Sequence, residues 1–294
     1  MDFDFKPWRD QVLASTEQAL SVWVGHNTPA SLAEPMRYAV LDGGKRFRPL
    51  LVHAASQAVG GQLEAALRAA CALELIHAYS LVHDDMPCMD NDVLRRGKPT
   101  VHVQFGQASA LLAGDALQAL AFEVLTPEQG VEPVVQARLC ALLSRAAGST
   151  GMAGGQAIDL ASVGLQLTED QLREMHRLKT GALLHASVMM GAACGQASAQ
   201  AHTQLGVYAD ALGLAFQVMD DVLDVTADSA TLGKTAGKDA ANDKPTYVSL
   251  MGLQAARDQA MSLHARAVEA LARSGLNQTQ ALLALADLVV HRAH

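Results

Sequence analysis

The segment QLEAALRAACALELIHAYSLVHDD, residues 62–85, decides the fold class of this chain. Its apolar residues recur at helical spacing and cover most of the circumference of the helix that this spacing predicts. A helix that is apolar on nearly every side is buried by other helices, so we expect the segment to lie inside a bundle. It ends in Asp84 and Asp85, and the end of an apolar segment is a poor place for charge that nothing neutralises.

Helical spacing continues along almost the whole chain, without sustained alternation of period two. We expect helices over residues 8–25, 32–42, 49–59, 62–85, 103–125, 132–147, 150–162, 169–194, 199–226, 246–273 and 276–291. No break between them resembles a linker, and the long irregular segment 227–245 has a length that is usually functional or disordered. The sequence therefore predicts an all-α fold, a single large helical bundle that forms one domain over residues 1–294.

The composition fits this fold and excludes one class of partner. Half of the 294 residues are apolar, only 18% are charged and 4% are aromatic, which favours extensive burial and helices over strands. The formal net charge of −8 argues against binding of nucleic acid by bulk electrostatics. A small anionic ligand would need local clusters of cations or bound metal ions.

The cysteines and the N-terminal residues indicate the cellular compartment of the protein. No CxxC pair occurs, and the four cysteines read as reduced residues of a cytosolic protein: Cys71, Cys88, Cys140 and Cys194. The first residues, MDFDF, lack the basic-then-apolar order of a signal peptide. The apolar stretch 182–195 contains His185 and is too short to cross a bilayer. We expect a soluble, cytoplasmic protein without a membrane span.

Two acidic clusters end long apolar segments, DDMPCMDND at 84–92 and DDVLD at 220–224. Asp220 and Asp224 are one helical turn apart and project from one face, which Gln217 joins, whereas Asp221 points elsewhere. In the first cluster Pro87 should disturb the helix and bring Asp90 back towards Asp84.

Like carboxylates held together need a cation or protons. Hard oxygen ligands without paired His or Cys suit Mg²⁺, which keeps waters and shares phosphate oxygens. The alternative for each cluster is a solvated helix end. The occurrence of two such clusters, both at the ends of apolar helices, favours a metal site.

Cations stand near both clusters, in GGKRFRP at 43–49, RRGKP at 95–99 and KTG at 179–181, and the loop after the second cluster holds Lys234, Lys238 and Lys244. The alternative for the arginines is that they only pair with the acidic cluster. A buried Lys179 would be costly without an anion. Guanidinium groups make forked contacts to phosphate oxygens and lysines add mobile point charges, so the whole set suits diphosphates.

Two further patterns are weaker. Glu74 and His77 have the ExxH spacing of di-iron carboxylate bundles, but no second ExxH occurs. Gly154 and Gly155 are not preceded by a strand, so they do not form a nucleotide-binding loop, and close packing of two helices would explain them.

These motifs resemble those of the trans-type short-chain prenyl diphosphate synthases, most closely the bacterial farnesyl type. The resemblance runs from about residue 38 to 247 and continues more loosely to the C-terminus. Its markers are GGKRFRP at 43–49, ELIHAYSLVHDDMPCMDND at 74–92, LRRGKPT at 94–100, LLAGDAL at 111–117, GGQAIDL at 154–160, KTG at 179–181 and FQVMDDVLD at 216–224. Six or more motifs in this order make the resemblance specific.

The resemblance implies the isoprenoid synthase fold, with a central active-site cavity between two facing acidic motifs, and a homodimer. It implies three Mg²⁺ ions, held by Asp84, Asp90, Asp220 and Asp224. It assigns the allylic diphosphate to Arg95, Lys179, Lys234 and Lys244, and isopentenyl diphosphate to Lys45, Arg48, His77 and Arg96. It places Thr180 and Gln217 against the developing allylic cation. Asn242-Asp243 before Lys244 departs from the glycine common in the family and leaves the role of Lys244 open.

The activity implied is condensation of dimethylallyl or geranyl diphosphate with isopentenyl diphosphate. Product length should depend on residues below the first acidic cluster, where Ser80 is one turn from Asp84 and Tyr79 is its neighbour. Small Ser80 leaves the pocket open and Tyr79 closes it lower down, which favours farnesyl diphosphate, although Tyr79 as a simple packing residue is the alternative. Geranylgeranyl or geranyl diphosphate synthases, a terpene cyclase and a non-catalytic partner subunit remain as rivals.

Overall fold

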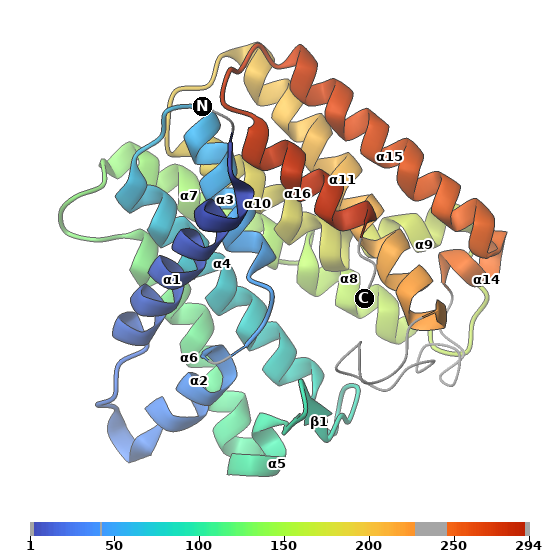
Figure 1. Cartoon of the computed structure of the whole chain (residues 1–294). Coiled ribbons are helices and arrows are strands. Elements are labelled where there is room, and N and C mark those ends of the chain that lie inside the picture. Colours follow the sequence, from blue (N-terminus) through green and yellow to red (C-terminus); the bar gives the residue numbers. More distant parts are fainter. Residues whose placement is uncertain (1–2, 42, 227–245, 292–294) are drawn as a thin grey trace.

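The computed structural model describes residues 3–41, 43–226 and 246–291, which form a bundle of helices with α3 and α10 at its centre (Figure 1). In chain order the elements are α1 (Phe5–Trp23), η1 (Pro29–Ser31), α2 (Ala33–Val40), α3 (Phe47–Ala58), α4 (Leu63–Asp84), β1 (Leu94–Arg95), β2 (Lys98–Pro99), α5 (Val101–Phe105), α6 (Gln107–Leu125), α7 (Pro133–Ala147), α8 (Met152–Ala161), α9 (Glu169–His176), η2 (Arg177–Gly181), α10 (Ala182–Ala193), α11 (Ala199–Thr226), α14 (Tyr247–Met251), α15 (Leu253–Arg273) and α16 (Gln280–Val290). The all-α prediction is confirmed.

The central position of α10 follows from its sequence. Every residue from Leu183 to Ala193, apart from His185, is buried, as expected for a helix that is apolar all round. Neighbouring residues of α10 serve two hydrophobic clusters, since Leu184 packs in one and Leu183 in the other. A side chain at Gly191 would lie 2.3 Å from the Val52 carbonyl oxygen, so this glycine permits the close approach of α3.

Two expected helices are divided by glycines. The segment 103–125 is broken into α5 and α6 at Gly106, where φ is 86°, and the segment 246–273 is broken into α14 and α15 at Gly252, where φ is 84°. The sequence also did not predict the hairpin of β1 and β2, in which Leu94 pairs with Pro99 and Arg95 with Lys98. Strands of two residues are too short to show alternation.

Within the described part of the chain, two helices, α4 and α6, are long and apolar enough to cross a membrane by length and composition alone. In α4 the apolar window is 67% buried inside the bundle, as in the core helix of a soluble protein, whereas in α6 it is 39% buried.

The two acidic motifs come to the same end of the bundle. Figure 1 shows the C-terminal ends of α4 and α11 in the lower half of the view, with α8 and α14 near them. α10 packs against both α4 and α11, and this packing helps to bring together residues that are far apart in the sequence.

Candidate active site

A cavity of about 450 Å³ lies between α3, α4, α8 and η2. Its volume is in the range of small-molecule sites. Apolar and small residues of α8 form part of its wall, namely buried Met152 and the more exposed Ala153, Ala157 and Leu160. Of the residues that the sequence predicts for the site, seven line this cavity: Arg48, His77, Tyr79, Ser80, Asp84, Lys179 and Thr180.

Asp84 is the last residue of α4 and stands at the cavity wall. The chain then turns tightly, and the backbone N–H of Asp90 donates to the Asp84 carbonyl at 2.8 Å. The prediction that Asp90 returns towards Asp84 is therefore confirmed. Burial raises the pKa of the Asp84 carboxyl to about 6, against the opposing charge of Lys179, and Asp90 adds to the rise. A bound cation would relieve this cost.

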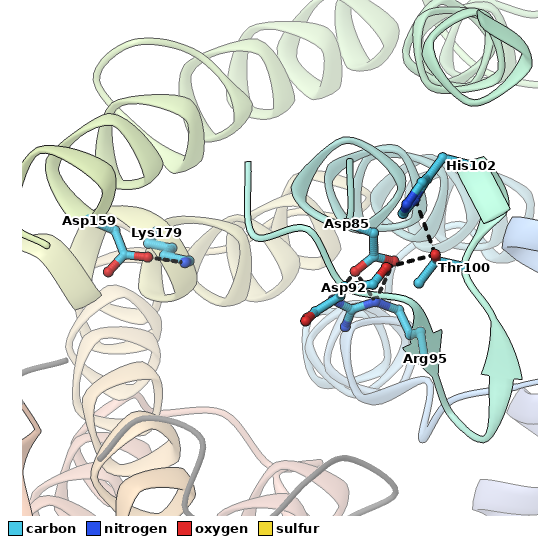
Figure 2. Close-up of polar contacts among 7 residues, drawn as sticks. All are labelled: Asp85, Asp92, Arg95, Thr100, His102, Asp159 and Lys179. Atoms are coloured by element: carbon cyan, nitrogen blue, oxygen red, sulfur yellow. Dashed lines mark hydrogen bonds and ion pairs between the residues drawn. The ribbon is translucent and has the colours of Figure 1, made fainter. Parts of the chain in front are cut away.

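The second aspartate of the first motif, Asp85, does not face the cavity in the same way. It is 2% exposed, and both of its oxygens accept from Arg95 Nε at 2.8 and 2.9 Å, while Arg95 Nη2 donates at 2.6 Å. Figure 2 shows this group beside Asp92, Thr100 and His102. Asp85 therefore orients Arg95, which the sequence predicts as a diphosphate ligand.

In the second motif, too, the two adjacent aspartates have different surroundings. Asp221 is 3% exposed and accepts from Gln217 Nε2 at 2.9 Å and from the backbone N–H of Tyr247 at 2.8 Å. It joins α11 to the start of α14. Asp220 is less buried. Burial lowers the pKa of Arg48, a residue of the cavity wall, and the charges of Glu74 and Asp220 oppose this shift.

In each motif, then, the second aspartate holds the scaffold, whereas the first is less buried. Adjacent residues of a helix differ by about 100° in direction, which explains how neighbouring aspartates take different tasks. Gln217 is placed with Asp221 by its hydrogen bond, and its predicted contact with the allylic cation stays a prediction.

The cations of residues 43–49 also divide into scaffold and site. Arg46 is 5% exposed. It donates from Nη1 to Glu74 at 2.8 Å, from Nε to Glu17, and from Nη2 to the Val40 carbonyl. Glu74 is thus the partner of a buried arginine, which explains the ExxH pattern without a di-iron site.

Arg48 and His77 instead line the cavity. Burial lowers the pKa of Arg48, and its Nε has no hydrogen-bond partner among the described residues. Burial and the nearby Arg48 and Arg96 place the pKa of His77 well below its usual range, so the imidazole is neutral. An anionic ligand would stabilise both arginines, because opposite charge offsets the cost of burial.

Arg96 lies across the glycine pair. A side chain at Gly44, where φ is 97°, would lie 2.7 Å from Arg96 Nη2, and one at Gly43 would lie 3.1 Å from Nη1. The glycines therefore make room for a guanidinium next to exposed Lys45. Burial lowers the pKa of Arg96, and Arg46 lowers it further.

Lys179 lies in η2, a π-helical turn between α9 and α10. Such turns are frequent at functional sites. Its Nζ donates to Asp159 Oδ2 of α8 at 2.6 Å (Figure 2), and Asp159 is 7% exposed. The carboxylate keeps the ammonium group at the cavity wall and balances its charge.

Gly155 sets the distance between α8 and η2, as close packing of two helices predicts. A side chain there would lie 2.1 Å from the Lys179 backbone nitrogen and 2.5 Å from its Cα. We expect Gly155→Ala to lower kcat at least tenfold and to reduce the melting temperature by several degrees, because backbone atoms cannot yield. Steady-state kinetics and thermal unfolding measure both.

The matched control is Gly206→Ala in α11, where the nearest atom is 3.9 Å away. This change should leave activity unaltered and stabilise the helix slightly, because alanine has the higher helix propensity. Equal behaviour of the two variants would show that Gly155 is not a spacing residue.

The acidic residues of the site are suitable ligands for magnesium, although they do not form a complete coordination shell. Within the described ranges no three His, Cys, Asp or Glu side chains converge on one point. Mg²⁺ is commonly bound by one or two carboxylates together with waters and substrate phosphates. The raised pKa of Asp84 and the buried Arg48 and Arg96, whose pKa values burial lowers, match a site that is completed by a metal–diphosphate.

Some predicted residues cannot be placed. Lys234, Lys238 and Lys244 lie outside the described residues. Other participants were missed by sequence reasoning, namely Glu17, Arg46, Asp159 and the supporting role of Asp85. The motif GGQAIDL contains Asp159, but a single acid in a helix carries no signal until its partner is known.

The chain matches known proteins over nearly its full length. A family model described as polyprenyl synthetase matches residues 29–281. The farnesyl diphosphate synthase of Escherichia coli is 45% identical over 299 residues, which cover 98% of this chain and 99% of that protein. A heterodimeric geranylgeranyl pyrophosphate synthase large subunit of Arabidopsis thaliana is also 45% identical, over 99% of this chain and 80% of the relative.

Solved structures agree with these matches. A geranyltransferase from Helicobacter pylori, complexed with magnesium and isoprenyl diphosphate, superposes with a TM-score of 0.85 at 33% identity. The match covers 97% of both chains.

Proposed function

The chain belongs to the polyprenyl synthetase family and has its all-helical isoprenoid synthase fold, and we propose that it is a magnesium-dependent prenyltransferase that joins an allylic diphosphate to isopentenyl diphosphate. One observation carries the proposal. A cavity with part of its wall apolar also has Asp84, Lys179, Arg48 and His77 on that wall, so that an acid suited to a metal and cations suited to two diphosphates meet around space for a hydrocarbon chain.

The metal ligands in this proposal are Asp84 and Asp90 on one side and Asp220 and Asp224 on the other. We propose three ions. When bound with a diphosphate, magnesium supplies positive charge that stabilises this group as it leaves with the bonding electrons. The Helicobacter pylori relative with magnesium and isoprenyl diphosphate supports this assignment.

The protein's own residues position the two substrates. The allylic diphosphate would be held by Lys179 and Arg95. Asp159 orients Lys179, and Asp85 orients Arg95. Lys45, Arg48 and Arg96 would hold isopentenyl diphosphate, and neutral His77 would donate a hydrogen bond to it. Lys234 and Lys244 keep their proposed role as further ligands of the allylic group.

Thr180 and Gln217 are proposed to face the allylic cation, since both offer oxygen atoms that stabilise positive charge. The double bond of isopentenyl diphosphate attacks this cation in a site from which water is excluded. The released diphosphate takes the final proton, so that no side chain acts as a nucleophile.

We propose farnesyl diphosphate as the main product. Tyr79 and Ser80 both line the cavity below Asp84, as expected for residues that limit the growing chain. Geranylgeranyl diphosphate is the alternative, because curated relatives of about equal similarity carry either name. Geranyl diphosphate is a further alternative.

A direct assay tests the function. The purified protein is incubated with dimethylallyl and isopentenyl diphosphates and Mg²⁺, and the carbon number of the dephosphorylated product is measured. We expect farnesol, with geraniol as a transient species. A cyclic hydrocarbon formed without isopentenyl diphosphate would indicate a terpene cyclase, and no product in any combination would indicate a non-catalytic subunit.

Replacement of Tyr79 tests the product limit. We expect Tyr79→Ala to convert at least half of the product to geranylgeranyl diphosphate, because removal of the ring deepens the cavity by about one helical turn, near the length of one isoprene unit. Product chromatography measures the change. Tyr38→Ala, at an aromatic residue outside this cavity, is the control, and an unchanged product would make Tyr79 a packing residue.

We also propose a homodimer. The apolar helix α6 exposes Leu111 and Leu112 at 47% and 54%, and a helix face of this kind is commonly covered by a partner. Sedimentation velocity would detect the dimer, and a monomer at micromolar concentration would contradict it.

A cytoplasmic location is proposed as well. All four cysteines are free thiols, including exposed Cys88, which fits a reducing compartment. Fractionation of cells that express the chain tests this location.

A further inference from the structure

We propose that His83, held against Gly114, forms the side wall of the product cavity towards α6 and is a second determinant of product length beside Tyr79. This inference rests on the proposed function. It starts from a contact that the catalytic assignments do not use. A side chain at Gly114 would lie 2.1 Å from His83 Nε2, 2.5 Å from Cδ2 and 2.8 Å from Cε1, so the outer edge of the imidazole is pressed against the α6 backbone.

Two further contacts hold the ring in place. His83 Nε2 lies 3.1 Å from the Leu111 carbonyl oxygen of α6, so this nitrogen carries the proton and donates. On the other side Tyr79, one turn earlier in α4, meets the imidazole edge-on at 5.7 Å between ring centroids. Tyr79, His83 and α6 therefore form one packed row.

The row stands between the cavity and α6. His83 and Tyr79 both line it, whereas none of its lining residues among the described part of the chain comes from α6. Behind the imidazole stands Gly114, which has no side chain to close the wall in its place. Removal of the imidazole would therefore extend the cavity sideways to the backbone of α6.

A larger residue at Gly114 would affect the same contact and should have the opposite effect on product length. With a methyl group at this position the imidazole must swing away from α6, because helix backbone cannot yield. With α6 blocked, we expect the ring to move into the cavity that it lines. A longer allylic chain would then meet the displaced ring, whereas the short dimethylallyl group would still fit.

The single variants should change product length in opposite directions. We expect His83→Ala to raise the ratio of twenty-carbon to fifteen-carbon product at least tenfold, and Gly114→Ala to raise the ratio of ten-carbon to fifteen-carbon product by a similar factor. Product chromatography after complete consumption of dimethylallyl diphosphate gives both ratios. His264→Ala, on the α15–α16 surface, and Gly206→Ala are the matched controls.

The double variant is the decisive measurement. If the steric conflict is with the imidazole, Gly114→Ala combined with His83→Ala should lose the ten-carbon shift and resemble His83→Ala. A purely structural defect at Gly114 would instead persist in the double variant. A twenty-carbon ratio unchanged in His83→Ala, or a ten-carbon shift retained in the double variant, would overturn the inference.

His83→Gln keeps the experiment decisive if His83→Ala does not fold. The glutamine amide can still donate to the Leu111 carbonyl and is thinner than the ring, so a smaller shift to twenty carbons is expected, with circular dichroism as the check on folding. Wild-type protein that forms no condensation product would refute the proposed function. Normal wild-type product with unaltered ratios in the variants would refute this inference alone.

Discussion

Replacing Asp84 and Asp220 together by alanine should reduce turnover about 10⁴-fold and leave the helix content unchanged. Removal of one group that stabilises transition-state charge costs roughly 10²–10³-fold, and these residues lie on the two opposing acidic motifs. Both side chains are only partly buried, so their removal leaves no void in the core. Release of inorganic diphosphate, followed with both substrates at saturation, measures the loss.

Their neighbours provide the matched contrast. Asp221→Ala leaves the Gln217 amide and the Tyr247 N–H without their acceptor, which costs about 1–3 kcal/mol of unfolding free energy. Asp220→Ala should cost little stability and most of the activity. Turnover retained by the Asp84/Asp220 double variant would refute the metal assignment, whereas a large loss of stability in Asp220→Ala would refute the division within the motif.

The second large effect concerns stability. Arg46→Ala should lower the free energy of unfolding by about 3–5 kcal/mol, because it leaves the buried carboxylate of Glu74 unpaired. Glu74 is 3% exposed and Arg46 5%. For a chain of this size the loss corresponds to roughly 10 °C in melting temperature. Calorimetry or thermal circular dichroism of the protein without ligands measures it.

Arg48→Ala is the control, two residues further along α3. Arg48 lies on the cavity wall, and its Nε lacks a hydrogen-bond partner among the described residues. This variant should unfold at about the wild-type temperature and show a raised KM for isopentenyl diphosphate. Equal melting temperatures for Arg46→Ala and the wild type would contradict the scaffold role of Arg46.

Local pattern predicted the helices because each helix carries its own periodicity. The continuous apolar surfaces of α4 and α10 indicated burial on all sides, and the structure confirms it. The breaks at Gly106 and Gly252 were not predicted. Both glycines have a positive φ, but the sequence of an apolar periodic segment does not reveal the φ of a glycine within it. The β1–β2 hairpin escaped because pairing between residues 94–95 and 98–99 depends on the turn between them.

Those residues of the site that belong to short sequence motifs could be predicted. Asp84, Arg48, His77, Lys179 and Thr180 were named from sequence and line one cavity. Partners that are distant in the sequence were not predictable. Two such pairs are Arg46 with Glu17 and Lys179 with Asp159. Neither partner can be identified from the sequence of the other, because only the packing of the helices brings them together.

By itself, the sequence determined the all-α class, the two acidic motifs and the two groups of cations, because periodicity and residue chemistry are local properties. The apolar segment 62–85 with Asp84 and Asp85 at its end already implied a buried helix with a metal site at its tip. Only the tertiary structure decided that Asp84 faces the cavity while Asp85 holds Arg95. The physical reason is that a carboxylate's task depends on its burial and on the donors that packing brings to it.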